Sequence, residues 1–321
     1  MDYSLDYLSF LLKAITVVFA IALLSMIKQK NKDMPVNFEV LNKKRIKSNL
    51  AHLHNLSKDS SKDLQKELKK SLKKVNKIND NLFIIDFKGD IKATEATGLR
   101  TIVSTIIDIA KPGDRVLLKL ESCGGEVTAY GLVASQIARF KNKNIHVTVA
   151  IDKVAASGGY LIAAVADSII AAPFAVIGSI GVILQAPNIN KLLKNNDIDI
   201  VELTAGKFKR TLTTVGENNK EGVAKAQEQI ESIHESFKNH ITAHRPDIAI
   251  DEVATGEIWL AKDAINHKLI DKIQTSDDFI ANSYADFKVI NVTQKTKKSK
   301  IQQLQNMCLW LEQHFSQNKI Y

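Results

Sequence analysis

From Leu82 onward, short apolar runs alternate along the chain with longer segments whose apolar residues recur at helical spacing. The strand-like runs are residues 82–87, 115–120, 145–151, 168–171 and 198–203. The helix-like segments are residues 94–110, 127–140, 157–166, 219–244 and 261–267. Strands that alternate with helices are joined by crossover connections, which build a mostly parallel sheet covered by helices. The pattern therefore predicts an α/β fold.

The composition excludes several classes of protein. Of the 321 residues, 45% are hydrophobic and 25% are charged, as in an ordinary globular enzyme. Cys123 and Cys308 are the only two cysteines, which excludes a disulfide framework and a CxxC metal site. The sequence contains no HExxH motif, no phosphate-binding GKS or GKT, and no GxGxxG. We therefore expect neither a metal ion nor a cofactor.

The formal charge of +9 is concentrated in the N-terminal part of the chain. Residues 1–80 carry 16 basic and 8 acidic side chains, whereas the remaining residues carry 28 and 27. A protein that binds a nucleic-acid duplex needs a basic stripe on its folded body. The near-neutral body therefore indicates no nucleic-acid partner.

The first 27 residues have the composition of a membrane anchor. Residues 7–27 are apolar apart from serine, threonine and Lys13, and about 20 residues at about 1.5 Å each suffice to cross a bilayer. A cleaved signal peptide fits less well, because Asp2 and Asp6 precede the apolar run and lysines follow it. A buried core helix is the structural alternative. We expect residues 1–27 to form one transmembrane helix in a lipid bilayer.

Three further segments follow the anchor in the predicted organisation. Residues 28–80 are polar and Lys-rich, and residues 58–77 repeat leucine and valine at helical spacing. This pattern predicts a helical stalk whose basic face is solvated and lies near acidic lipid headgroups. Residues 81–290 hold the α/β pattern and form the predicted globular domain. Residues 291–321 form a tail that is first basic and then amphipathic.

Three glycine-containing turns follow predicted strands. They are residues 121–126 (ESCGGE), 155–160 (AASGGY) and 204–209 (TAGKFK). Open parallel sheets place their functional sites at the carboxyl ends of strands, so these turns are candidate site elements. Paired glycines expose backbone N–H groups that can bind a phosphate or an oxyanion, although a plain tight turn has the same composition.

Ser157, in the second of these turns, has two interpretations that the residues alone leave open. Its hydroxyl could cap the helix that follows, or it could act as a nucleophile. A nucleophilic serine needs a base, and none of the eight histidines follows a strand end or flanks a glycine turn. A lysine is the remaining candidate, as in Ser/Lys dyads, although a lone lysine is usually just solvated.

Several longer motifs occur in the order found in one enzyme family. They are residues 130–136 (YGLVASQ), 152–160 (DKVAASGGY), 177–182 (IGSIGV), 205–210 (AGKFKR), 209–218 (KRTLTTVGEN) and 253–257 (VATGE). With these motifs, residues 5–280 resemble the SppA/SohB family of signal-peptide peptidases, and most closely its SohB branch. The resemblance implies a ClpP/crotonase-like fold, a spiral of ββα units, which assembles into rings or domes as a homo-oligomer.

The resemblance also implies a role for each matching residue. Ser157 matches the family nucleophile and Lys209 its general base, while Ser179 matches the serine that hydrogen-bonds the catalytic lysine. Gly124, with the glycine after it, matches the oxyanion-hole turn, to which Gly158 adds its backbone N–H. The implied activity is that of a serine endopeptidase that needs no cofactor. Its implied substrates are unfolded peptides such as signal-peptide remnants or membrane-protein fragments.

Two positions depart from the family pattern. Cys123 stands where family members often carry proline before the glycine pair, and Lys268 replaces a common glycine that ends a helix. A nucleophilic role for Cys123 lacks an apparent base partner. Lys207 and Arg210, which flank Lys209, are expected to add positive charge that disfavours its protonation.

Two rival functions remain open. A crotonase-type acyl-CoA enzyme would use similar paired amides for a thioester oxyanion, and a catalytically silent membrane scaffold would keep the fold for assembly alone. For localisation we expect the bacterial inner membrane, with a single pass. The lysines after the apolar run favour a cytoplasmic C-terminal side, whereas the family resemblance favours a periplasmic one.

Overall fold

The computed structural model describes residues 36–56 and 61–294, and residues 36–294 form one compact unit. Its strands are β1 (Val36–Val40), β2 (Asn81–Gly89), β3 (Arg115–Ser122), β4 (His146–Ile151), β5 (Val154–Ala156), β6 (Ser168–Ala171), β7 (Val176–Gly178), β8 (Ile258–Leu260), β9 (Lys272–Ile273) and β10 (Lys288–Gln294). Its helices are α2 (Leu41–Leu56), α3 (Ser61–Lys77), α4 (Ala96–Ile109), α5 (Val127–Lys141), α6 (Gly158–Ala163), α7 (Asn190–Lys194), α8 (Lys220–His244), α9 (Ile250–Val253), α10 (Ala261–Ala264) and α11 (Ser276–Ser283).

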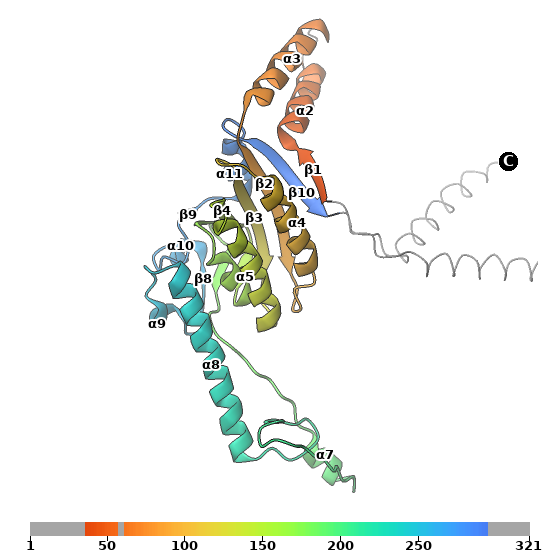
Figure 1. Cartoon of the computed structure of the whole chain (residues 1–321), viewed down its shortest axis with the longest axis vertical. Helices are drawn as coiled ribbons and strands as arrows, with labels where there is room; N and C mark the ends of the chain where they lie inside the picture. Colours follow the sequence, from red (N-terminus) through yellow and green to blue (C-terminus); the bar gives the residue numbers. More distant parts are fainter. Residues whose placement is uncertain (1–35, 57–60, 295–321) are drawn as a thin grey trace, which may run out of the picture. The chain divides into compact units, whose positions relative to one another are not determined.

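The strands form one mixed, mostly parallel sheet (Figure 1). Its main path runs β1-β10-β2-β3-β4-β6-β9, while β5 pairs with β3 and β7, and β8 pairs with β7. Every pair is parallel except β1 with β10 and β8 with β7. Helices α4 and α5 form the crossovers from β2 to β3 and from β3 to β4. The predicted α/β fold is therefore confirmed.

Both faces of the sheet are buried, and the side chains of β2 show how. Phe83 and Ile85 point into the larger core, which α4 and α5 complete. Leu82 and Ile84 point to the other face and into a second, smaller core, against which residues of α11 and the start of α2 pack. Successive side chains of a strand alternate between faces, so a sheet covered on both sides needs apolar residues at consecutive positions. This requirement explains the continuous apolar runs of the sequence.

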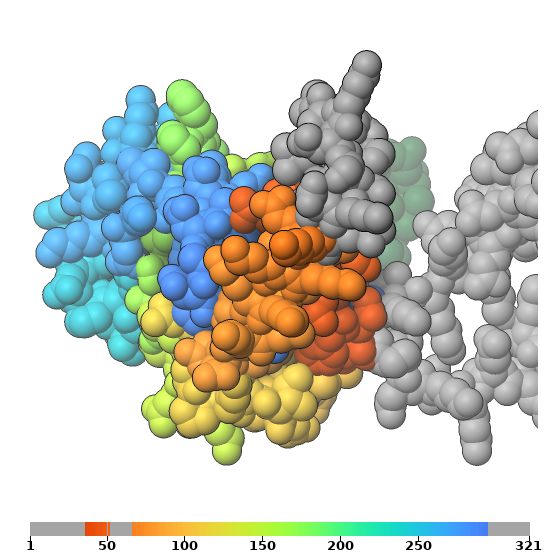
Figure 2. Space-filling view, turned by 90° about the horizontal axis from the view of Figure 1, so that it is seen from above, coloured from red at the N-terminus to blue at the C-terminus, as the bar shows by residue number. Residues whose placement is uncertain are grey.

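The folded unit begins earlier than the predicted boundary at residue 81. Strand β1 pairs with β10, and Val36 lies opposite Gln294. At the start of α2, Asn42 donates to the Phe287 carbonyl at 3.0 Å and accepts from the Val289 N–H at 2.7 Å. Figure 2 shows the red and orange residues of α2 and α3 beside the blue residues near β10. Part of the predicted stalk is thus built into the sheet.

Helix α3 has the predicted amphipathic character. Val75 is buried, whereas its described lysines are all exposed: Lys66, Lys69, Lys70, Lys73, Lys74 and Lys77. Because an α-helix turns by 100° per residue, these six positions share one side of it. The predicted amphipathic helix with a solvated basic face is confirmed for this segment.

Membrane spanning is a separate matter. Within the described part of the chain, no helix combines the length and apolar character needed to cross a bilayer. The predicted anchor, residues 1–27, lies outside the described residues, and so does the tail beyond Gln294.

The predicted strand at residues 198–203 is wrong. These residues form no regular element, and the side chains of Val201 and Leu203 are 83% and 91% exposed. A strand needs a hydrogen-bonding neighbour, and none of the described strands pairs with this segment.

Helix α8 begins and ends where the sequence predicts. Asn219 caps it by accepting a hydrogen bond from the Gly222 N–H, and the helix stops at His244, before Arg245 and Pro246. Arg245 then clamps the end of the helix to the sheet. Its guanidinium donates to both carboxylate oxygens of Asp271, at 2.9 and 2.7 Å.

Replacing Asp271 with asparagine should destabilise the fold. Burial would raise the pKa of Asp271, but the hydrogen bonds from Arg245 and the Ile169 N–H hold it below its usual value. Stability from this carboxylate is therefore present above its unfolded pKa, about 4, and is lost as the pH falls through the lower folded pKa. We expect D271N to lose about 0.5–1.5 kcal/mol in urea unfolding at pH 7, because solvent screens this partly exposed carboxylate, and the difference from the parent chain to shrink below about pH 4. If D271N and the parent chain differed equally in unfolding free energy at pH 7 and below about pH 4, the result would contradict a role for the charged Asp271 carboxylate.

Lys268 occupies a backbone position that suits glycine. Its φ is +58°, in the left-handed region, and it follows α10 where the chain turns towards β9. A side chain there costs about 1 kcal/mol relative to glycine. The position thus has the geometry that the missing family glycine implies, and the chain tolerates the strain.

Candidate active site

Ser157 lies at the junction between β5 and α6, with a backbone that is rare for serine. Its φ is +51° and its ψ is −120°, and its amide donates to the Gly178 carbonyl at 2.7 Å. Its hydroxyl makes no capping hydrogen bond to α6. The capping interpretation of Ser157 therefore fails. Backbone strain of about 1–3 kcal/mol is concentrated at functional sites, for example at the sharp turns that present nucleophilic serines.

The first glycine pair lies against Ser157. Gly124 has a φ of +91°, and a Cβ built on it would come within 2.7 Å of the Ser157 Cβ and 2.8 Å of the Gly158 nitrogen. Only glycine allows this approach. The structure therefore brings together three of the predicted site residues, although they come from two different strand ends.

The amides of this turn are not equivalent. The Gly124 N–H donates to the buried Ser122 Oγ at 3.0 Å, so this amide is already engaged. The N–H of Gly125 has no acceptor among the described residues, and neither has that of Gly158, which opens α6. The free donor of the turn is thus the second glycine of the pair and not the first.

Ser179 lies in the neighbouring turn, directly after Gly178, whose carbonyl accepts from the Ser157 amide. It also has a positive φ, +51°, and its own amide donates to the Glu257 carbonyl at 2.6 Å. Two consecutive turns of the sheet edge therefore each present a serine in a left-handed conformation. The structure brings Ser179 to the backbone of Ser157.

A cavity of about 550 Å³ opens beside Ser157. Sequence reasoning missed its far wall, which is formed by Ile233, Phe237 and His240 of α8. The helical spacing of these residues was visible, but which helix would cover Ser157 was not. The near walls include Leu161 and Val182, so the lining is largely apolar and could surround an apolar side chain.

His240 is the histidine of this cavity, and its ring is already engaged. Nε2 lies 3.0 Å from the Leu161 carbonyl oxygen, which can only accept, so Nε2 carries the proton in the neutral ring. Burial lowers the pKa of His240. The ring is therefore neutral near pH 7 and is held by the helix that follows Ser157. Among the described residues, no group of three or more histidine, cysteine, aspartate or glutamate side chains is placed to hold a metal ion.

Lys209 does not line this cavity. It is exposed, and it lies in the irregular segment between α7 and α8, where its amide donates to the Gly206 carbonyl at 3.1 Å. This segment is attached to the beginning of α8, since Lys207 pairs with Glu221 at 2.5 Å. Ile233, where the cavity wall begins, is about 18 Å further along the helix at about 1.5 Å per residue. The structure of one chain thus does not bring Lys209 to Ser157.

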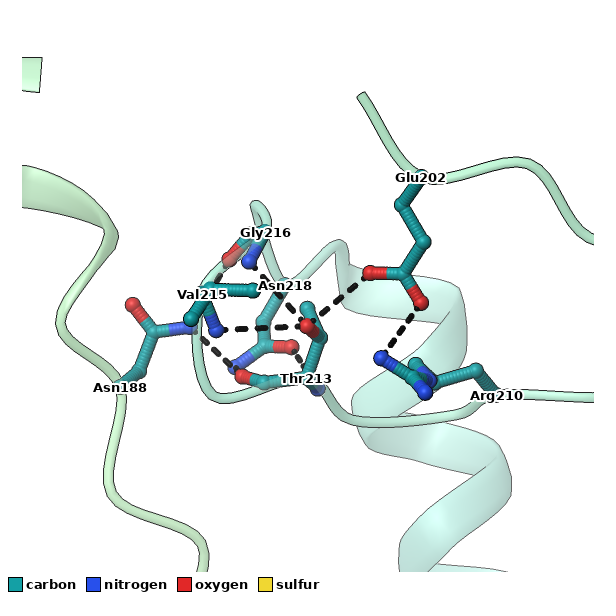
Figure 3. A network of polar contacts seen from close by, with 7 residues as sticks. All are labelled: Asn188, Glu202, Arg210, Thr213, Val215, Gly216 and Asn218. Carbon is teal, nitrogen blue, oxygen red and sulfur yellow. Dashed lines mark hydrogen bonds and ion pairs between the residues drawn. The ribbon is translucent and has the colours of Figure 1, made fainter. Parts of the chain in front are cut away.

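The segment that carries Lys209 is ordered by a polar network (Figure 3). Thr213 is its centre: its Oγ1 accepts from the Gly216 N–H and donates to Glu202 Oε2, both at 3.1 Å. Asn188 donates to the carbonyls of Thr213 and Gly216, which ties the segment to the chain before α7. A loop without regular structure is held in one conformation by such side-chain bonds.

The cationic neighbours of Lys209 are neutralised. Arg210 donates to Glu202 at 2.8 Å, and Lys207 pairs with Glu221. The expectation that these two cations raise the positive charge around Lys209 is therefore not met in the single chain. No ion pair of Lys209 occurs with any residue that the structure describes.

Comparisons with known proteins found two family models and several similar proteins. Residues 139–290 match the model of peptidase family S49, and residues 2–137 match its N-terminal companion, peptidase family S49 N-terminal. A solved structure of the 1510-N membrane-bound stomatin-specific protease, a lysine-to-alanine mutant with a substrate peptide, superposes with a TM-score of 0.47 at 14% identity, covering 71% of this chain and 99% of that one.

Two relatives carry the name "Probable protease SohB". The protein of Haemophilus influenzae is 51% identical over 68% of this chain and 62% of its own length. The protein of Buchnera aphidicola subsp. Schizaphis graminum is 40% identical over the whole length of both chains. Since identity at this level extends from end to end, and both family models match in order, the chain belongs to peptidase family S49.

Proposed function

We propose that this chain is a membrane-anchored serine endopeptidase in which Ser157 attacks the peptide bond and Lys209 of a second copy acts as the general base. The observation that carries the proposal is the strained Ser157, whose uncapped hydroxyl lies between a glycine turn and an apolar cavity. Membership of a peptidase family supports the reaction class. The finer assignment of fold, a ClpP/crotonase-like spiral of ββα units, is part of the same proposal.

The chemistry follows from the groups at the turn. A neutral lysine amine accepts the Ser157 hydroxyl proton while the Oγ bonds to the peptide carbonyl carbon. The carbonyl oxygen becomes an oxyanion and accepts hydrogen bonds from the N–H groups of Gly158 and Gly125. The lysine ammonium then gives its proton to the leaving amine as the C–N bond breaks. Water attacks the acyl-enzyme by the same route, and Ser157 is restored.

We assign the general base to Lys209 of a second copy because Lys209 of the same chain lies far from Ser157. The Lys209 segment is attached to the beginning of α8, whereas the Ser157 cavity is lined by its second half. A lysine exposed to water is protonated near neutral pH, so a general base must be withdrawn from water. The contact with a second copy would supply this burial.

Exposed apolar side chains lie on the same segment and support such an assembly. Val201 and Leu203 are 83% and 91% exposed, although they belong to residue types that are usually buried. Packing this segment over the cavity of a neighbouring copy would bury them and carry Lys209 to Ser157. In the proposed complete site, Ser179 hydrogen-bonds the incoming amine. The assembly would be a ring or dome of identical chains.

The proposed substrates are unfolded peptides, such as remnants of signal peptides or fragments of membrane proteins. The cavity beside Ser157 has the apolar lining and the volume for a large apolar side chain. The apolar run at residues 7–27 would hold the enzyme at the bilayer, where such peptides are released.

The detergent-solubilised full chain should hydrolyse an unstructured polypeptide such as casein. A compact folded protein of the same size should be cut at least about tenfold more slowly, because an extended strand must enter the site. Hydrolysis is followed by the release of new amino groups, with a medium-chain acyl-CoA thioester as the parallel substrate. Cleavage of the thioester without cleavage of casein would favour the crotonase-type rival, and turnover of neither would favour a silent scaffold.

A further inference from the structure

We infer that Ser122 and Tyr130 form a positioning pair that holds the oxyanion-binding turn in register with Ser157. The inference rests on the proposed function, since it assigns a role within the same site. Neither side chain reaches the Ser157 hydroxyl in any recorded hydrogen bond, so both would act through the backbone they hold. The pair joins the end of β3 to helix α5, the two elements that flank the turn.

The hydroxyl groups of Ser122 and Tyr130 make the first set of contacts that hold the turn. The oxygens of Tyr130 and Ser122 lie 2.5 Å apart and share a hydrogen bond, and Ser122 Oγ accepts the Gly124 N–H at 3.0 Å. Tyr130 donates its hydroxyl proton to the Asp90 carbonyl at 2.8 Å, so the Ser122 hydroxyl donates to the Tyr130 oxygen, and the Gly89 carbonyl oxygen lies 3.2 Å from the Ser122 oxygen. Because the Gly124 amide is bonded to Ser122, the turn is fixed at this residue, and the N–H of Gly125 remains free to bind a substrate.

The aromatic ring of Tyr130 makes the second set of contacts, with the backbone of Gly158. A Cβ built on Gly158 would come within 2.5 Å of Tyr130 Cγ and 2.7 Å of Cδ1, so the ring lies directly on the backbone of Gly158. Gly158 follows the nucleophile and supplies the other oxyanion donor in the proposed mechanism. Tyr130 therefore contacts Gly158 directly through its ring, while its hydroxyl bonds to Ser122, which holds the Gly124 amide beside the free N–H of Gly125.

Two further glycines fit around the same pair. A Cβ on Gly89 would lie 2.4 Å from the Tyr130 oxygen and 2.6 Å from Ser122 Oγ, and a Cβ on Gly159 would lie 2.6 Å from the Ser122 carbonyl oxygen. Contacts this short leave no room for a larger residue. The absence of side chains at these glycines lets the backbone close on Ser122 and Tyr130 from three sides, which restricts the movement of both.

The surroundings keep the pair rigid and neutral. Tyr130 is fully buried and Ser122 is 2% exposed. Burial raises the pKa of Tyr130, so its hydroxyl remains protonated and able to donate at neutral pH. Loss of a well-placed oxyanion donor lowers kcat by about 100- to 1,000-fold, and a displacement of about 1 Å can cost about 100-fold. A residue that only orients a donor should therefore matter somewhat less than the donor itself.

The variants Tyr130→Phe and Ser122→Ala test the inference in the full chain. Tyr130→Phe keeps the ring on Gly158 and removes only the hydroxyl, while Ser122→Ala removes the acceptor of the Gly124 amide. We expect each to lower kcat for an unstructured peptide by about 10- to 100-fold, with KM changed less than about twofold. The double variant should have a kcat no lower than that of the more impaired single variant, because both substitutions break the same hydrogen-bonded pair.

A transition-state analogue separates positioning from general damage. Ser157 adds to a peptide aldehyde to give a hemiacetal whose oxygen occupies the oxyanion site, so aldehyde affinity should fall in parallel with kcat. Binding of the uncleaved peptide, measured in the Ser157→Ala background, should stay within about twofold. The matched control is Tyr160→Phe, which removes an equally buried hydroxyl that bonds to the Leu269 carbonyl at 2.9 Å.

The outcomes distinguish a failure of the proposed positioning pair from a failure of the proposed peptidase function. Loss of kcat and aldehyde affinity in Tyr130→Phe and Ser122→Ala, but not in Tyr160→Phe, would support the positioning pair. Values within about twofold of the parent chain in both variants would overturn it, and so would an equal loss in Tyr160→Phe. If the parent chain itself neither cleaves peptides nor binds the aldehyde, then the proposed function fails first.

Discussion

Replacing Ser157 with alanine is expected to lower kcat for peptide cleavage by at least about 1,000-fold, because removal of the nucleophile leaves only substrate binding and the oxyanion donors. The substitution deletes one oxygen from a half-buried side chain that makes no capping bond. Both residues meet the same backbone strain at a φ of +51°. The melting temperature should therefore change by no more than about 2 °C.

The matched control for this prediction is Ser283→Ala. Ser283 is a buried serine whose hydroxyl donates to the Phe279 carbonyl at 2.7 Å within α11, on the other face of the sheet. Its replacement should leave kcat within about twofold of the parent value. A Ser157→Ala chain that keeps more than about a tenth of the parent activity would remove this serine from the reaction.

Lys209→Ala is expected to be as inactive as Ser157→Ala, and the two inactive chains should restore activity when they are assembled together. In a ring in which each site takes its serine from one copy and its lysine from the next, random mixing of equal amounts leaves both groups intact in about a quarter of the sites. Co-expression of the two variants with different affinity tags, followed by selection for both tags, yields the mixed assemblies. Their casein cleavage is then compared with that of the parent chain.

The control for the mixing experiment pairs Ser157→Ala with the double variant that lacks both groups. This mixture contains no intact serine and should remain inactive. A Lys209→Ala chain that is active alone would exclude the lysine as the base. Inactive mixed assemblies, verified by size and by both tags, would contradict the assignment of the lysine to a neighbouring copy. They would then require the segment before α8 to fold back onto its own cavity.

Much of the fold could be predicted because it depends on local patterns. Apolar runs such as 115–120 form strands where neighbours on both sides complete their hydrogen bonds and helices cover both faces. Helix α8 was predictable at both ends from its Asn219 cap and from Pro246. Residues 198–203 have a similar apolar content but form no strand, because pairing is a property of the whole sheet and not of the segment.

The candidate site could be predicted only where its backbone conformation requires a particular residue type, such as glycine, that is visible in the sequence. The glycine pairs at 124–125 and 158–159 are visible because close approach requires them. Ser122 and Tyr130 show no such requirement, since a buried serine and a buried tyrosine resemble ordinary core residues. Their importance follows from contacts between elements, and so does the distance of Lys209 from Ser157 within one chain.

The most direct measurement is to identify the residue that a serine-reactive fluorophosphonate with an apolar side chain modifies in the assembled full chain. The phosphonate forms a bond to a nucleophilic oxygen and releases fluoride, and peptide mass spectrometry locates the adduct. The adduct should lie on Ser157, be absent from Ser157→Ala, and form at least about tenfold more slowly in Lys209→Ala, because the base that takes the hydroxyl proton is missing. An adduct on any other residue, or equal labelling with and without Lys209, would contradict the proposed mechanism.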